Sequence, residues 1–452
     1  MRVCHGFTAV FDDPNLVSCA GLAPVLRLAE RAGLQRLAAE HVRIDHPGGR
    51  FAGVKVSALV AGMVAGADSI EDMDLLRHGG MARLFGGVRA PSTLGTFLRT
   101  FTFGHVRQLD AVASRLLVNL ARQAPLLPGA DQLAYIDVDD TVRQTYGYAK
   151  QGAGRGYTGV KGLNALLAVV STEASAPVIA AARLRKGSTN SVKGAHRLVA
   201  DALVTATAAG ASGVRVLRAD SAFYSHDVIA ACRRHQSRFS ITARLNSAVR
   251  TAIAAIDDDA WTPIKYTHAV YDEAQQRWIS EAQVAEIGYT AFTSKGTDKQ
   301  VTARLIVRRV PDLNPAHQSE LFTAYRYHAV FTDSPLPMLQ AEKAHRAHAI
   351  VEQVIADLKN GPLAHLPSGH FWANSAWLVC AAMAFNLTRA AGTLASAFHA
   401  RATTGTIRAQ LINVPARIAR SARRLTLHLP AAWPWEPHWQ RLLAGTGPPP
   451  PA

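Results

Sequence analysis

Cysteine is scarce in this sequence, and its scarcity excludes two kinds of stabilised domain. The 452 residues include four cysteines, far apart and without a C-x-x-C pair: Cys4, Cys19, Cys232 and Cys380. Neither a disulfide framework nor a zinc ribbon is therefore expected, and a reducing compartment such as the cytoplasm fits the composition. The length allows about three domains and a sizeable core.

Long hydrophobic runs are also missing. The most apolar stretches, Val56–Ala67 and Trp377–Leu387, are shorter than the roughly 18 residues that span a bilayer. The N-terminus reaches Asp12 before any apolar run suited to a signal peptide. We therefore expect two buried helices and no membrane partner.

Acidic residues are few relative to basic ones. Lys and Arg number 49 against 33 Asp and Glu, which gives a formal net charge of +16. Residues 142–246 hold 15 basic and 4 acidic side chains, and residues 399–452 hold 7 and 1. A solvated surface would account for part of this excess. Its size favours a polyanionic partner, with nucleic acid as the leading candidate.

Apolar periodicity and turn signals divide the chain into five parts. Helical spacing predicts an α-helical N-terminal region, which is either a helix-turn-helix that binds DNA ends with Arg99 and Arg107 facing the DNA or a plain helical bundle. Strands alternate with helices after the Pro-Gly signal at Pro128. The later boundaries follow a strand-rich stretch, a long helix with an apolar second helix, and an Arg-rich end with a Pro-rich disordered tail. The predicted parts are 1–128, 129–245, 246–335, 336–398 and 399–452.

The order of elements in the second part predicts a mixed α/β fold. Three strands are followed by a helix, a strand, a helix and a strand, the first strand being "LAYIDVDDT" and the fourth "GVRVLRADS". This is the order of a ribonuclease-H-like core, one of several α/β arrangements that the pattern allows. Residues 246–335 are predicted to be a β-strand-rich insertion in that core.

Three aspartates crowd the end of the first strand. Alternation places Asp137 and Asp139 on one face and Asp140 on the other. Carboxylates this close repel one another unless a cation neutralises them, although a turn or cap would also explain part of the cluster. Asp220 ends the fourth strand, which lies beside the first strand in this topology, so Asp139 and Asp220 could share one metal-binding edge. Alternatively, Asp220 is only a helix cap.

The long helix at residues 337–361 is predicted to show two faces. At about 100° per residue, one narrow stripe holds His345, His348, Glu352 and Lys359, and apolar residues occupy the other side. An amphipathic helix with a solvated face would look the same. Zinc is disfavoured because H-E-x-x-H is absent. Two aspartates and a glutamate instead suit Mg²⁺, two ions of which can clamp a phosphodiester.

These segments resemble the DDE transposases of bacterial insertion sequences. "YIDVDDT" is similar to their Asp-x-Thr strand, "LRADSAFYS" to their second-aspartate strand and "HRAHAIVEQVIADLK" to their glutamate helix. With "APSTLGTFLR", the set resembles insertion-sequence family thirteen-eighty. In many relatives the helix carries Tyr and Arg where this chain has His345 and His348.

The resemblance implies catalytic and metal-ligating roles for Asp139, Asp220 and Glu352, with Asp137 and Asp140 as rivals for the first position. It implies two Mg²⁺ ions, or Mn²⁺, and double-stranded DNA as partner, both as terminal inverted repeats and as target. A homodimer would carry out cut-and-paste transposition on the bacterial nucleoid, with or without a DNA hairpin. DNA contacts are expected from seven residues: Lys359, His348, His345, Arg183, Arg185, Lys186 and Lys193.

Two other functions share these residues. A nuclease of the same fold would cleave without strand transfer, and an inactive remnant would only bind DNA through the N-terminal region. The intact carboxylates argue against the remnant.

Overall fold

The computed structural model describes residues 5–6, 8–146, 149–156, 158–272, 277–312, 325–421 and 424–447. The chain divides into two compact units. Unit 1 holds residues 1–126, 147–151 and 357–452, and unit 2 holds residues 127–146 and 152–356. Unit 1 is therefore assembled from segments that are distant in the sequence, whereas unit 2 is nearly continuous.

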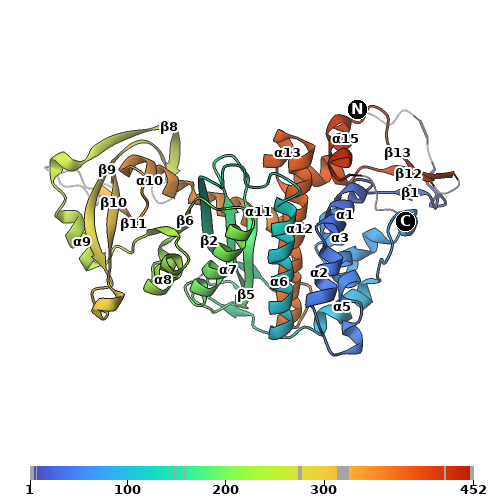
Figure 1. Ribbon diagram of the computed structural model, residues 1–452, viewed down its shortest axis with the longest axis horizontal. Coiled ribbons are helices and arrows are strands. Elements are labelled where there is room, and N and C mark those ends of the chain that lie inside the picture. Colours follow the sequence, from blue (N-terminus) through green and yellow to red (C-terminus); the bar gives the residue numbers. More distant parts are fainter. Residues whose placement is uncertain are drawn as a thin grey trace. The chain divides into compact units, whose positions relative to one another are not determined.

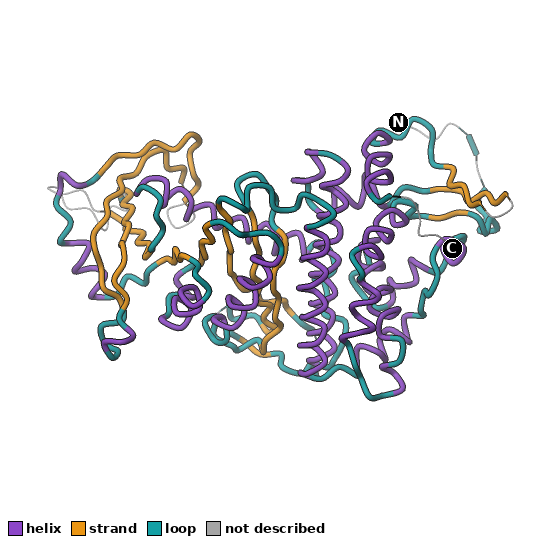
Figure 2. The backbone as a smooth tube through the Cα atoms, viewed as in Figure 1, coloured by secondary structure: helices purple, strands orange, loops and turns teal. Residues whose placement is uncertain are grey.

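Unit 1 is mainly helical, as its apolar spacing predicts (Figures 1 and 2). Its helices pack around the long helix α12, and a small antiparallel sheet has the order β1-β12-β13. The helices are α1 (Leu22–Arg31), α2 (Leu34–His41), α3 (Ala52–Ala65), α4 (Met81–Leu84), α5 (Pro91–Arg99), α6 (Phe103–Ala121), α12 (Phe371–Ala395), α13 (Ala397–Arg401), α14 (Thr404–Ile407) and α15 (Glu436–Gly445). The strands are β1 (Leu16–Val17), β12 (Ala416–Ser421) and β13 (Arg424–His428).

Helix α12 contains the apolar run Trp377–Leu387 and extends well beyond it. By length and composition it is the one helix in the described residues that could cross a membrane. Nearly all of it is buried, including Trp377, whose Nε1 donates to the carbonyl of Pro362 over 2.6 Å. Its apolar surface is thus accounted for by the core of unit 1, as is that of α3.

Unit 2 is built on one mixed sheet of ten strands (Figure 1). The sheet runs β3-β4-β2-β6-β7-β11-β10-β9-β8, and β5 pairs with β4. The strands are β2 (Leu133–Gln144), β3 (Gly154–Arg155), β4 (Lys161–Ser171), β5 (Val178–Lys186), β6 (Val214–Ala219), β7 (Arg238–Thr242), β8 (Thr262–Asp272), β9 (Arg277–Ala291), β10 (Val301–Pro311) and β11 (Tyr325–Thr332). The helices are α7 (Ala195–Ala208), α8 (His226–Arg234), α9 (Ser247–Ala254), α10 (Met338–Arg346) and α11 (Ile350–Lys359), the last ending beyond the boundary of unit 2.

The five strands predicted between residues 129 and 245 are all present, and the first and fourth are neighbours as expected. β2 runs parallel to β6, and β6 parallel to β7, while β4 is antiparallel to β2. Helices α7 and α8 pack against each other, α7 over β5 and β4 and α8 on β7. Parallel neighbours bring their carboxyl ends to one edge of the sheet, which is where the acidic residues lie.

The strand-rich stretch that we expected as an insertion continues the same sheet. β11 pairs antiparallel with β7, and β10, β9 and β8 follow outward. Helix α10 covers β9 and β10 through a small apolar cluster of Val284, Ile306 and Ala341. The hydrogen bonds between β11 and β7 join strands β8 to β11 to the sheet formed by the five earlier predicted strands.

Three predictions for the C-terminal part of the chain can be compared with the structure. The predicted part 336–398 is split, since residues from 357 onward belong to unit 1. The Pro-rich tail lies mostly outside the described residues, which end at Gly447. The predicted final strand is present as β13.

Candidate active site

The acidic residues of unit 2 meet through strand register. Asp137 is paired with Arg218 and Val138 with Ala219 across the parallel strands β2 and β6. The next residue on β2 is Asp139, and the next after β6 is Asp220. Two carboxylates from segments 81 residues apart therefore stand at the same sheet edge. This placement depends on the parallel pairing of the two strands.

Asp137 is neutralised by an arginine. Arg218 donates from Nε to Oδ1 over 2.7 Å and from Nη2 to Oδ2 over 2.6 Å. His348 Nδ1 lies 3.0 Å from the same Oδ1. Asp137 is fully buried and Arg218 nearly so. A bidentate pair of this kind occupies the carboxylate, so Asp137 is bound within the protein.

Asp140 is neutralised in the same way on the other face of β2. Arg185 Nη2 donates to Asp140 Oδ2, and Arg185 also bonds Asn164 Oδ1 and the carbonyl of Ser191. Both charged side chains are buried. Of the three candidates for the first catalytic position, two are thus paired with buried arginines.

Asp139 is different, because in the described residues no basic side chain is bonded to it. Its Oδ1 accepts the Asp140 backbone N–H at 2.7 Å. Burial raises the pKa of Asp139 to about 7, and the charges of Asp220 and Asp140 add to the rise, while the Asp140 N–H and His348 oppose it. A carboxyl in this state gains most from a bound cation.

Asp220 caps the short 3-10 turn that follows β6. Its carboxylate accepts the Ala222 N–H at 2.9 Å, so the helix-cap alternative is correct as far as local structure goes. The residue keeps solvent access, yet surrounding protein raises the pKa of its carboxyl, and Asp140 contributes to the rise. Asp220 is thus both a cap and a carboxylate that faces other negative charge.

The predicted stripe of His345, His348, Glu352 and Lys359 crosses a change of helix type, and the rings of His345 and His348 lie stacked with 6.5 Å between their centroids. A 3-10 turn at Ala347–Ala349 separates α10 from α11. His345 is buried between Ser240 and Thr242, whose hydroxyl oxygens lie 3.0 and 2.9 Å from its two ring nitrogens. A rotation of about 100° per residue, which assumes one continuous α-helix, does not hold across this 3-10 turn.

The remaining members of the stripe have different surroundings. His348 reaches Asp137, and its charge acts on both Asp139 and Asp220. Glu352 is exposed in the first turn of α11, whereas Val351, Val354 and Leu358 are buried. Lys359 is half-buried and belongs to unit 1.

Asp139 and Asp220 fit a hard divalent cation, since they are oxygen donors of like charge that meet without a bonded basic partner. The third ligand is not assembled beside them. Within the described ranges, no three or more His, Cys, Asp or Glu side chains form a group that could hold a metal ion. The geometry therefore provides two of the three expected carboxylates.

The basic residues expected to contact DNA fall into two groups. Lys186 and Lys193 are exposed, and Arg183 is half-buried beside Asp201, with 2.9 Å between Arg183 Nη2 and Asp201 Oδ2. Arg185 and His345 are instead buried and bonded inside unit 2, which corrects the expectation that they reach phosphate. Their polar atoms are already used by the protein.

Sequence reasoning missed Arg218, as well as Ser240 and Thr242, which bond His345. Arg218 lies two residues before Asp220, between the buried Leu217 and Ala219, and a charge flanked by buried apolar residues is the signal that could have identified it. Ser240 and Thr242 carried no such signal, because hydroxyl residues are common on strands.

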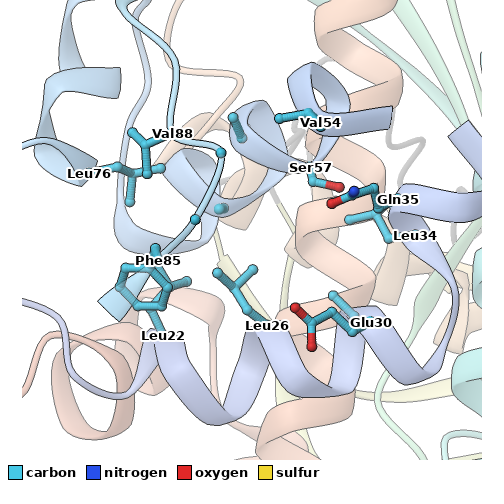
Figure 3. Close-up of a pocket in the computed structure, with 15 residues that line it drawn as sticks. Leu22, Leu26, Glu30, Leu34, Gln35, Val54, Ser57, Leu76, Phe85 and Val88 are labelled. Carbon is cyan, nitrogen blue, oxygen red and sulfur yellow. The ribbon is translucent and has the colours of Figure 1, made fainter. Parts of the chain in front are cut away.

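Unit 1 contains a cavity of about 80 Å³ that is unsuited to this chemistry (Figure 3). Its lining is mostly apolar, with Leu22, Leu26 and Phe85 around it and Glu30 as its one charged side chain. A single carboxylate without a basic or acidic partner offers no acid-base pair or metal site. The acidic edge in unit 2 is thus the better candidate.

Comparison with known proteins gives one result. A family model described as transposase DDE domain, group 1, matches residues 5–446. A comparison with curated proteins gave no match.

Proposed function

The chain belongs to the DDE transposase family, and from this premise we propose that Asp139, Asp220 and Glu352 are its catalytic carboxylates. Membership of the family makes it an enzyme that acts on DNA. The observation that carries the assignment is the position of Asp139 and Asp220 just beyond the last paired residues of β2 and β6, while Asp137 and Asp140 are held by arginines.

In this proposal Asp139 and Asp220 hold divalent metal, Mg²⁺ or Mn²⁺, and Glu352 from α11 supplies the third carboxylate. The bound metal would activate the attacking oxygen and stabilise the leaving oxygen. The raised pKa of Asp139 supports this role, since the unfavourable charge of the neighbouring carboxylates is offset when a cation binds.

The proposed reaction is cut-and-paste transposition of an insertion sequence, of the kind found in family thirteen-eighty. Water attacks a phosphodiester at each terminal inverted repeat, the P–O3′ bond breaks, and a 3′-OH leaves. That hydroxyl then attacks a target phosphodiester in line, and the target 3′-oxygen leaves. The protein forms no covalent bond in either step. A homodimer would pair the two ends, on chromosomal DNA in the cytoplasm.

The fold is consistent with this proposal. The order β5-β4-β2-β6-β7, with β4 antiparallel to β2, is that expected of a ribonuclease-H-like core, and β8 to β11 would be the insertion. The helical N-terminal residues would bind DNA ends. Phosphate contacts are proposed for Lys186, Lys193, Arg183, Lys359 and His348.

A plasmid carrying the flanking DNA of the gene tests the proposal. Purified protein incubated with it should cut at terminal inverted repeats with Mg²⁺ and leave it intact with EDTA. Joining of the freed ends to a second plasmid indicates transposition, and cutting without joining indicates a nuclease. DNA binding with no cutting in Mg²⁺ or Mn²⁺ would identify a remnant.

A further inference from the structure

We infer that the Arg218–Asp137 ion pair is a positioning unit that fixes the segment carrying Glu352 against strands β2 and β6. This inference rests on the proposed role of Glu352. Neither residue is proposed to touch DNA or metal; both act through the segment between α10 and α11.

The contacts of Arg218 join three parts of unit 2. From β6, its Nε and Nη2 bond the Asp137 carboxylate on β2, and its Nη1 donates to the carbonyl of Ala344 over 2.6 Å. Its guanidinium also lies 4.0 Å from the centre of the Tyr135 ring. One side chain thereby links both strands that carry the aspartates to α10.

Asp137 makes the second link to the same segment. Its Oδ1 receives Arg218 Nε and also lies 3.0 Å from His348 Nδ1. Ala344 lies in the last turn of α10, His348 lies within the 3-10 turn, and Glu352 is one helical turn beyond His348. The two bonds therefore hold the chain immediately before the exposed glutamate.

Burial of the pair favours a geometric role over a purely stabilising one. A buried ion pair contributes little net stability compared with apolar residues of similar volume, and one use of such pairs is to specify a register. Here the pair fixes the position at which α11 begins relative to Asp139 and Asp220, because it bonds the residues just before α11.

The chain offers a matched control in Arg185–Asp140. It is also a buried arginine paired with a β2 aspartate, but it connects β2 with β5 and with the loop carbonyls of Ser191 and Lys193. The bonds described for Arg185 go to β2, to β4 and to the loop after β5, which are elements other than the segment 344–352. Substituting either arginine removes the arginine partner of a buried carboxylate on β2, so general damage should be similar.

Arg218→Met and Arg185→Met are compared in the full-length protein by two measurements. Amide hydrogen exchange without metal should rise at least tenfold over residues 344–352 in Arg218→Met and stay within twofold of wild type there in Arg185→Met. Calorimetry with DNA ends present should show the Kd for Mn²⁺ at least tenfold higher in Arg218→Met than in Arg185→Met.

A cycle with Glu352→Gln tests whether the effect passes through that residue. In the Glu352→Gln background, Arg218→Met should change the Kd for Mn²⁺ by less than twofold. If Arg218→Met fails to fold, His348→Ala replaces it, because it removes one link without leaving Asp137 unpaired, and a smaller change in the same direction is expected.

Equal effects of Arg218→Met and Arg185→Met, or an undiminished effect in the Glu352→Gln background, would overturn the positioning role. Failure of the wild-type protein to bind Mn²⁺ or cut DNA would instead contradict the proposed function. The exchange measurement separates the two cases, because it needs neither metal nor cleavage.

Discussion

Asp139 and Asp220 occupy the positions immediately after Val138 and Ala219, the last paired residues of the parallel strands β2 and β6. In the described residues neither carboxyl is bonded to a basic side chain. Burial raises the pKa of Asp139, and the negative charge of Asp220 adds to the rise. The site is thus built around unbalanced negative charge.

Asp139→Asn and Asp220→Asn should each lower the rate of DNA cleavage at least about 100-fold, because a metal-binding charge is lost where charge develops in the reaction. Affinity for DNA ends should stay within a few-fold. Gel assays of cleavage and binding measure both. Asp227→Asn, an exposed carboxylate on α8, is the control and should cleave normally. Normal cleavage by either site variant would exclude that residue.

The stability of the metal-free protein should depend on pH through Asp139. Its pKa is about 7 in the folded state against 3.8 for the ordinary group, so the folded protein binds this proton more tightly. The stabilisation of the folded state by this bound proton is fully present below pH 4 and is lost as the pH rises to about 7. Asp139→Asn should therefore raise the unfolding free energy at pH 8 by at most about 4 kcal/mol and change it little at pH 4. Urea unfolding in EDTA measures this difference, and an equal effect at both pH values would contradict it.

His345 should make the protein sensitive to acid. Burial lowers the pKa of His345 to about 3, with the charges of His348 and Arg218 contributing, against 6.5 when unfolded. Stability is lost as the pH falls from 6.5 toward 3, by about 1.4 kcal/mol per pH unit. In His345→Gln this part of the slope should disappear in a series of unfolding curves. His365→Gln, an exposed histidine, serves as the comparison and should keep the wild-type slope.

The buried Arg185–Asp140 pair should matter far more for stability than an exposed one. Arg185→Met removes the arginine partner of the buried Asp140 carboxylate, and should lower the unfolding free energy by about 3–5 kcal/mol. Arg238→Met removes an exposed arginine 3.7 Å from Asp333 and should cost less than about 1 kcal/mol. Chemical denaturation of both variants checks the contrast. Similar losses would mean that Arg185 is not held as described.

Lys186 and Lys193 should contribute to DNA affinity through phosphate contacts. Replacing either exposed lysine by Gln should weaken binding to all DNA sequences alike. It should also reduce the slope of log K against log salt concentration by about one. Fluorescence anisotropy between 50 and 200 mM salt measures the slope. An unchanged slope in the double variant would remove these residues from the interface.

The sequence by itself determined much of the fold and part of the site. Strand patterning identified the five strands of residues 129–245, and the clustering of Asp137, Asp139 and Asp140 located the acidic edge, because apolar alternation and unusual charge density are local properties. It also indicated the apolar helix around Trp377, whose burial in the core of unit 1 is confirmed.

Only the tertiary structure decided among the three aspartates. Arg218 and Arg185 are 81 and 45 residues from the carboxylates that they neutralise, so no local pattern could show that Asp139 alone lacks such a partner. A 3-10 turn at Ala347–Ala349 likewise lies between His345 and Glu352. His345 bonds Ser240 and Thr242, and His348 bonds Asp137, and these partners are too distant in the sequence for a local pattern to show them. Local periodicity predicts elements, whereas long-range ion pairs determine which side chains stay open for chemistry.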